Sequence, residues 1–223
     1  MLKRRTLLLV ICFAALSLSA APAMADMFGF ELFNLSASFT GTGSGTGSFT
    51  TTEWAQASGV LSRYVPTTGT ASFDAYSWYM GSEALLVDMD ITNIATKTAD
   101  GAGTLTLTDV DNDYISADVK GGWTKLSTSA SLFVGTLSNV YYNELTNTTF
   151  DGHSGDSVSM DFPLPQPWNG AIVQLTSTGG WFGEDYADKT GGYINATVVP
   201  TPAAVLLGML GLGVAGLKLR KFA

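Results

Sequence analysis

The sequence predicts an all-β protein built as an antiparallel β-sandwich of the jelly-roll kind, and three observations support this fold class. Residues 26–200 are rich in Thr, Ser, Gly and aromatic side chains and poor in long helix-forming residues, a bias that favours strands. Polar and apolar residues alternate in several short runs, which places every second side chain on one face of a strand. Turn signals separate these runs at the spacing typical of antiparallel sandwiches and barrels.

Four runs define the expected strands most clearly, because each carries its apolar side chains on a single face. These faces consist of Leu85, Val87, Met89 and Ile91; Leu105 and Leu107; Ile115, Ala117 and Val119; and Ile194, Ala196 and Val198. Turn signals separate the runs at 101–103, 121–122, 151–155, 179–180 and 191–192. The pattern predicts about ten to twelve strands. Only residues 53–57 fit a single helical turn.

Two further segments are expected to connect strands rather than to form them. The low-complexity stretch at 41–48 predicts a flexible loop between strands that end at Thr40 and begin at Phe49. Residues 162–168 include three prolines, which lack an amide donor, so this segment is expected to cross between strands in an extended conformation.

The first 25 residues have the three parts of a secretory signal peptide. Basic residues precede an uncharged apolar stretch at 6–20, and an A-x-A cleavage site follows at 23–25. The apolar stretch is too short to favour an uncleaved anchor, since a spanning helix needs about 20 residues. Cleavage between Ala25 and Asp26 would remove Cys12, the only cysteine, so the mature chain could form no disulfide bond.

The C-terminal residues form a second ordered arrangement. A proline motif comes first, then an uncharged apolar stretch at 203–217, and then a basic cluster. The motif is Val199, Pro200, Thr201 and Pro202, and the cluster contains Lys218, Arg220 and Lys221. This order resembles the PEP-CTERM sorting signal, although Glu usually stands where this chain has Thr201. An ordinary single-span anchor, with its basic tail on the cytoplasmic side, is the alternative interpretation.

The resemblance implies recognition by an exosortase, a membrane cysteine transpeptidase that cuts near the proline motif. The protein would then pass to the cell surface or the extracellular matrix. Residues 1–25 are therefore expected to be a signal peptide, residues 26–198 an extracellular β domain, and residues 199–223 a sorting signal with a transmembrane helix.

Charge is distributed unevenly along the chain. All 19 acidic residues but only five of the 11 basic residues lie between positions 26 and 200, which gives this part a net charge of −14. That charge argues against a nucleic-acid partner, since phosphate binding needs a basic patch.

Asp109, Asp111 and Asp113 form the most suggestive polar cluster. They are expected in a turn that follows a strand ending near Thr108. Three carboxylates so close together repel one another, and a hard cation such as calcium would relieve the repulsion with oxygen ligands. The loop is not an EF-hand, because Tyr114 stands where that motif needs glycine. The sequence favours the alternative, a solvated acidic hairpin tip.

The other chemical candidates are weaker. His153, the only histidine, lies near a Gly-Asp-Ser string at 155–157, but no spacing supports a Ser-His-Asp triad, so a loop residue is expected. Glu184, Asp185 and Asp188 form a second acidic group. The aromatic residues are expected mainly in the core, with a sugar-binding surface as the alternative.

Together these features predict an exported surface or extracellular-matrix protein with a non-enzymatic structural or interaction domain and no cofactor other than the calcium considered above. The expected partners are an exosortase-like membrane protease and extracellular polysaccharide. A carbohydrate-binding module is the alternative function. A secreted hydrolase is the third, and it would need a cleft with two close carboxylates.

Overall fold

A computed structural model describes residues 27–64, 69–73, 85–153, 155–162, 166–168 and 171–198. The signal peptide with its Ala25–Asp26 cleavage site lies outside these residues, as do the proline motif at 199–202 and the basic cluster at 218–221. What the sequence predicts for those segments stays a prediction. Among the described residues, no helix is long and apolar enough to cross a membrane.

The described residues form eleven strands, which agrees with the number expected from the sequence. Residues 53–57, which fitted a helical turn, belong to the second strand. The strands are β1 (Met27–Gly43), β2 (Thr46–Tyr64), β3 (Gly69–Phe73), β4 (Leu85–Thr92), β5 (Thr98–Thr108), β6 (Tyr114–Lys125), β7 (Ser131–Asn143), β8 (Thr149–Asp151), β9 (Ser157–Ser159), β10 (Ala171–Ser177) and β11 (Tyr186–Val198).

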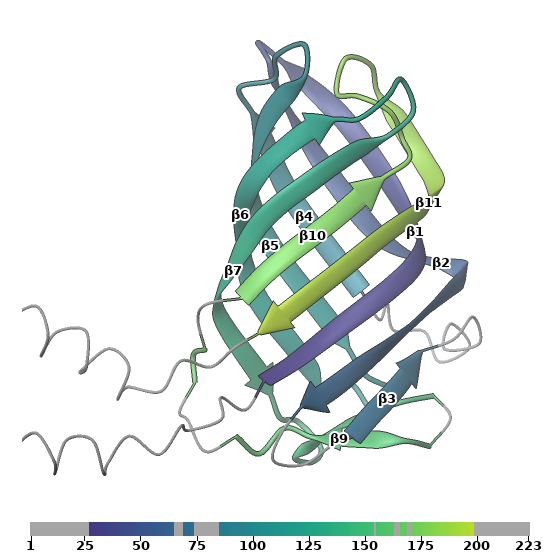
Figure 1. Ribbon diagram of the computed structural model, residues 1–223, viewed down its shortest axis with the longest axis vertical. Helices are drawn as coiled ribbons and strands as arrows, with labels where there is room; N and C mark the ends of the chain where they lie inside the picture. Colours follow the sequence, from purple (N-terminus) through teal and green to yellow (C-terminus); the bar gives the residue numbers. More distant parts are fainter. Residues whose placement is uncertain are drawn as a thin grey trace, which may run out of the picture.

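Eight of these strands close into an antiparallel barrel, so the prediction of a β-sandwich is wrong. In order around the ring, they are β1, β2, β4, β5, β6, β7, β10 and β11, and β11 pairs with β1 to complete it (Figure 1). The closing pair begins with Phe28 opposite Val198. Alternation along a strand is the same in a sandwich and in a barrel. Ring closure depends instead on pairing between strands far apart in the chain, which no local pattern reports.

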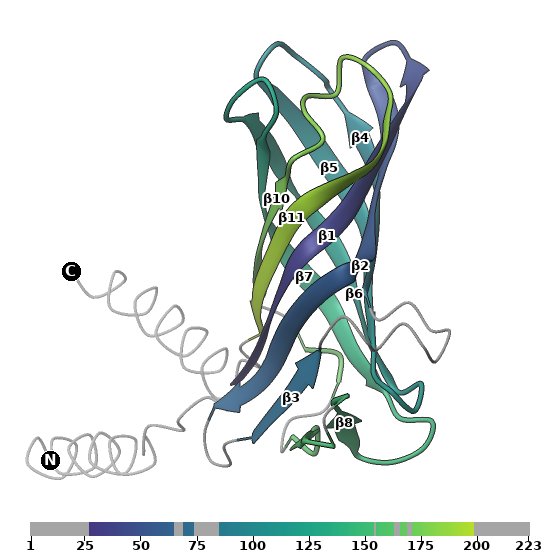
Figure 2. The same cartoon turned by 90° about the vertical axis from the view of Figure 1, so that its right-hand side faces the viewer.

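The barrel has two differently built ends. The upper end carries the β1–β2, β4–β5, β6–β7 and β10–β11 connections (Figure 1). The lower end carries the β5–β6 turn, the start of β1, the end of β11 and the long connection between β7 and β10 (Figure 2). Within that connection, β8 and β9 form a small separate hairpin, while β3 extends the sheet beside the lower part of β2.

The core lies inside the barrel and confirms the predicted apolar faces. All twelve residues of those faces are buried, whereas Asp88 and Asp90 lie exposed on the outer side of β4. An eight-stranded barrel is just wide enough for side chains to fill its interior. Large rings do so here, since Trp123 packs against Phe49 and Phe133 with ring centroids 4.8 and 5.3 Å away.

Three glycine clusters expected as turns lie within strands instead: 101–103 in β5, 121–122 in β6 and 191–192 in β11. Gly101 pairs with Gly121, which pairs in turn with Gly135, so the three glycines lie side by side across β5, β6 and β7. A Cβ on Gly101 would lie 2.9 Å from Trp123 Nε1, and one on Gly121 would lie 2.8 Å from Phe133 Cζ. These glycines therefore make room for the rings inside the barrel.

The flexible loop expected at 41–48 is a tight hairpin. β1 continues to Gly43 and β2 begins at Thr46, so only Ser44 and Gly45 form the turn. Both residues have positive φ angles, 55° and 73°. Such a two-residue turn with positive φ at both positions matches the twist of the flanking strands. The repeated glycines therefore belong mostly to strands, with the positive φ values confined to the turn and Gly43.

Candidate functional site

The lower end of the barrel brings together the polar residues that the sequence singled out. β5 ends at Thr108 and β6 begins at Tyr114, so the aspartates lie in the intervening turn, as predicted. The chain from the end of β7 through β8 packs against this turn, because Val110 N donates to the carbonyl oxygen of Asp151 at 3.5 Å. Two features result, an aspartate network and an adjoining pocket.

Asp113 is the structural centre of the network. It is completely buried, and its Oδ1 accepts the backbone N–H groups of Leu145 at 2.6 Å and Thr146 at 2.7 Å. Its Oδ2 accepts the N–H of Asn147 at 3.1 Å and lies 3.0 Å from the Tyr142 hydroxyl. Burial alone would raise the pKa of Asp113, but the three N–H donors and the tyrosine outweigh burial and lower it.

Asp109 lies beside Asp113, but its pKa is shifted in the opposite direction. It is 3% exposed, and its Oδ1 accepts the N–H groups of Asp111 at 3.1 Å and Asp113 at 2.9 Å. Its Oδ2 accepts the N–H of Asp151 at 2.9 Å. Burial raises the pKa of Asp109 to about 7. The amides of Asp151 and Asp111 oppose the rise, while the Asp111 carboxylate adds to it.

Asp109, Asp111 and Asp151 each place a carboxylate oxygen within 4.8 Å of the other two. Asn147 bridges two of them, because its Nδ2 donates to Asp111 Oδ2 at 2.9 Å and to Asp151 Oδ2 at 3.0 Å. Asp111 Oδ1 is buried and has no hydrogen-bond partner among the described residues. The group can relieve its repulsion in two ways, by keeping a proton on Asp109 or by taking up a hard cation through carboxylate oxygens.

The structure replaces one of the three residues predicted for the calcium site. Asp113 is committed to backbone amides, and Asp151, more than thirty residues further along the chain, takes its place beside Asp109 and Asp111. The preferred solvated-tip interpretation is wrong, since Asp109 and Asp113 are buried and hydrogen-bonded. Calcium binding stays a prediction. Nothing local in the sequence marked Asp151 as a partner, because only the fold brings β8 to the β5–β6 turn.

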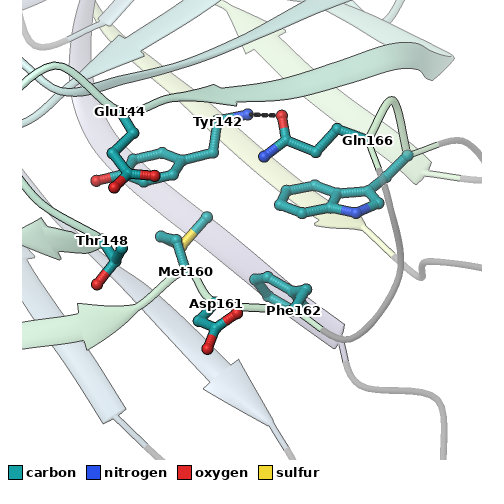
Figure 3. Close-up of a pocket in the computed structure, with 8 residues that line it drawn as sticks. Tyr142, Glu144, Thr148, Met160, Asp161, Phe162 and Gln166 are labelled. Atoms are coloured by element: carbon teal, nitrogen blue, oxygen red, sulfur yellow. Dashed lines mark hydrogen bonds between the residues drawn. The ribbon is translucent and has the colours of Figure 1, made fainter.

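A pocket of about 240 Å³ opens beside this network (Figure 3). Its floor is largely apolar and comes from buried side chains of the barrel and the β7–β10 connection. These are Tyr142, Met160, Phe162 and Trp168. Its rim is polar and exposed. The rim residues are Glu144, Thr148, Asp161 and Gln166.

Several contacts hold the pocket in shape. Gln166 Oε1 accepts the N–H of Tyr142 at 2.8 Å, so the amide nitrogen of Gln166 is the group turned toward the open space (Figure 3). The buried Arg63 donates to the carbonyl oxygens of Ser159 at 2.7 Å and Asp161 at 2.9 Å. Its guanidinium carbon also lies 4.1 Å from the centre of the Phe162 ring, so β2 anchors this wall of the pocket.

The aspartate network supports the opposite wall. By fixing the amides of residues 145–147, Asp113 sets the course of the chain between Glu144 and Thr148, which both line the rim. The Tyr142 hydroxyl lies 2.6 Å from the carbonyl oxygen of Thr149 and also contacts Asp113. Tyr142 therefore belongs to both features, and the network acts as a frame for the pocket.

The other predicted candidates do not join this site. His153 is an exposed turn residue, as expected. Glu184, Asp185 and Asp188 lie at the upper end, where Asp185 Oδ1 accepts the N–H of Gly41 at 2.8 Å. Most described tryptophan side chains confirm the core prediction: Trp123 and Trp168 are buried, while Trp181 is partly buried against the core and donates to the Ala95 carbonyl oxygen.

Four pocket residues carried no functional signal in the sequence: Glu144, Thr148, Asp161 and Gln166. They form two local pairs in the chain between β7 and β10, at 144 and 148 and at 161 and 166, and only the fold brings the two pairs to one pocket.

The chain matches no protein-family model, no curated protein and no solved structure. What can be inferred about its function therefore depends on the sequence and on this geometry.

Proposed function

We propose that the protein is exported and sorted to the cell surface or the extracellular matrix, where its barrel acts as a non-enzymatic structural or interaction domain. An exosortase-like membrane protease that reads Val199, Pro200, Thr201 and Pro202 is its processing partner. Signal peptidase cleavage between Ala25 and Asp26 precedes that step.

One structural observation carries the proposal. Phe28 pairs with Val198 across the closing strands, so the barrel begins and ends at neighbouring positions on its lower end (Figure 2). β1 starts at Met27, immediately after the expected new N-terminus, and β11 ends at Val198, immediately before the proline motif. Both processing steps therefore remove segments that lie outside the strands, and every strand of the ring stays whole.

The pocket favours binding over hydrolysis. Glu144 and Asp161 both line it, but both are exposed at the rim. A glycosidase needs one carboxylic acid in a setting that keeps it protonated near neutral pH, which enzymes achieve by burial or by a neighbouring charge. Among the described residues, Asp109 is a carboxylic acid with a raised pKa, but its oxygens accept backbone N–H groups inside the network and it does not line the pocket.

Mass spectrometry of both termini of the protein recovered from outside its host cells tests the proposal. We expect a chain that starts at Asp26 and ends between Val199 and Ala203. The double variant Pro200→Ala, Pro202→Ala should accumulate uncut in the membrane, while Pro66→Ala, outside the motif, should be processed normally. A released protein that still ends at Phe222-Ala223, or one that begins at Met1, would contradict the proposal.

A further inference from the structure

We propose that the pocket at the lower end binds a single sugar unit without acidic groups, from a neutral or aminated polysaccharide. The inference rests on the proposed function in one respect: export would bring the protein to an extracellular polysaccharide. Binding itself depends only on the pocket.

The lining of the pocket matches the two kinds of group on a sugar ring, its C–H groups and its hydroxyls. Tyr142, Met160, Phe162 and Trp168 offer an apolar floor against which the C–H groups of a ring can pack. Carboxylate, amide and hydroxyl groups at the rim offer hydrogen bonds to ring hydroxyls. Small-molecule sites commonly combine an apolar lining with a few convergent polar groups.

The size of the pocket limits the ligand. Its volume of about 240 Å³ lies below the roughly 300–1,000 Å³ of pockets for drug-sized molecules. The pocket is open at the rim, where its polar side chains are exposed. One ring of a longer chain can therefore enter while neighbouring rings stay in solvent.

Charge selects against acidic sugars. Neither the Glu144 nor the Asp161 carboxylate has a hydrogen-bond or ion-pair partner among the described residues, so both are available to a donor-rich ligand. The nearby cation, Arg63, lies buried against Phe162, where it donates to two backbone carbonyl groups. A uronate would bring a third carboxylate to the rim, whereas a hydroxyl or an ammonium group would be a donor to the two already there.

Gln166 offers a test that preserves the fold. Its Oε1 accepts the Tyr142 N–H, and its Nε2 faces the pocket. Gln166→Glu keeps an acceptor for Tyr142 but replaces the donor that faces the ligand with an acceptor. Gln174→Glu, at an exposed position on the outer face of β10, is the matched control for the added charge.

The measurement is calorimetric titration of the protein isolated from its host, with three probes: cellotetraose, a chitosan tetramer and tetragalacturonate. We expect at least one of the first two probes to bind, and tetragalacturonate to bind at least about tenfold more weakly or not at all. Gln166→Glu should weaken cellotetraose binding about three- to tenfold, the value of one hydrogen bond. Glu144→Gln should weaken chitosan binding similarly, while Gln174→Glu and Glu184→Gln should change either affinity less than twofold.

Three results would overturn the inference: no heat of binding with either non-acidic probe at millimolar concentration, equal effects of pocket and control variants, or tetragalacturonate binding as tightly as the others. Near-ultraviolet circular dichroism of each variant verifies that it has folded. The termini of the same preparation, read by mass spectrometry, report separately on sorting, so failure of one proposal is distinguishable from failure of the other.

Discussion

At the upper end of the barrel, Phe182 enters from the β10–β11 loop and packs against Phe39, Phe49 and Trp123. At the lower end, Phe28, Phe162 and Trp168 also pack together, and Tyr142, which lines the same pocket as Phe162 and Trp168, donates to the buried Asp113. The described upper end is thus closed by apolar packing. The lower end combines apolar packing with buried carboxylates that accept the N–H groups of irregular chain.

The difference shows how a barrel can carry a site without weakening its wall. Irregular chain leaves backbone amides unpaired, and burying them without partners costs free energy. Asp109 and Asp113 together accept six backbone N–H groups, and four of these belong to the β7–β10 connection, which can therefore pack closely and form a pocket. We therefore expect mutation and pH to change the free energy of unfolding differently at the two ends.

The largest expected effect is at the upper end. Trp123→Ala should lower the free energy of unfolding by about 4 kcal/mol, because it removes a fully buried ring and leaves a cavity. Urea denaturation followed by circular dichroism measures the change. Leu126→Ala, at a side chain 58% exposed, is the control and should stay within about 0.5 kcal/mol. A loss below about 1 kcal/mol for Trp123→Ala would show that the rings do not seal this end.

At the lower end, Asp113→Asn should cost about 3 kcal/mol, since an amide group replaces an oxygen that accepts an N–H and lies beside the Tyr142 hydroxyl. Asp118→Asn is the matched control, because the exposed Asp118 accepts only from Asn139 Nδ2 at 2.6 Å among the described contacts. Its cost should be below about 0.5 kcal/mol. Equal costs for the two variants would contradict the framing role of Asp113.

The contributions of Asp109 and Asp113 to stability should depend on pH in opposite directions. The raised pKa of Asp109 means that the folded state keeps its proton longer than the unfolded state does. The resulting stability is complete below about pH 4 and is lost as the pH rises to about 7, a fall of about 2 kcal/mol between pH 5 and 7. The lowered pKa of Asp113 acts oppositely, and its contribution is lost as the pH falls below about 4.

Chemical denaturation at a series of pH values measures this slope. Asp111→Asn should flatten it between pH 5 and 7, because it removes the carboxylate that helps to raise the pKa of Asp109. A slope unchanged in Asp111→Asn would contradict the assignment. Repeating the series with excess calcium and with excess chelator tests whether the group takes up a cation. Calcium that raises stability near pH 7.5, above the pKa of Asp109, would assign a cation, and no difference between calcium and chelator would argue against one.

The smallest expected effect is at the β1–β2 hairpin. Gly45→Ala should cost about 1 kcal/mol, because φ is +73° at this residue and a side chain is strained in that conformation. Gly183→Ala is the control, since no atom lies within 4 Å of its added Cβ and its φ is not in the left-handed region. Thermal unfolding of the two variants measures the contrast. A stabilising Gly45→Ala would mean that the turn has another conformation.

Much of the barrel wall could be predicted from the sequence, and little of the site could. Leu85–Ile91 and Ile115–Val119 show period-2 alternation, and a strand half-buried in any β architecture requires that period. The same period cannot distinguish an inward glycine from a turn glycine, so the sequence predicts turns at Gly101 and Gly121 where the structure has strands. The position of the aspartate turn was predictable because β5 and β6 both alternate up to its edges.

The sequence by itself determined that the chain is β-rich, acidic between its two ends, free of mature disulfide bonds if the signal is removed, and strongly alternating in the strands that form the core. The tertiary structure decided the rest. It closed the sheet into a ring through β1 and β11, buried aspartates that looked solvated, exchanged Asp113 for Asp151 in the acidic group, and assembled a pocket around Gln166. The physical reason is range: alternation and turn chemistry act between near neighbours, whereas ring closure, burial of charge and pocket shape depend on residues that meet only after folding.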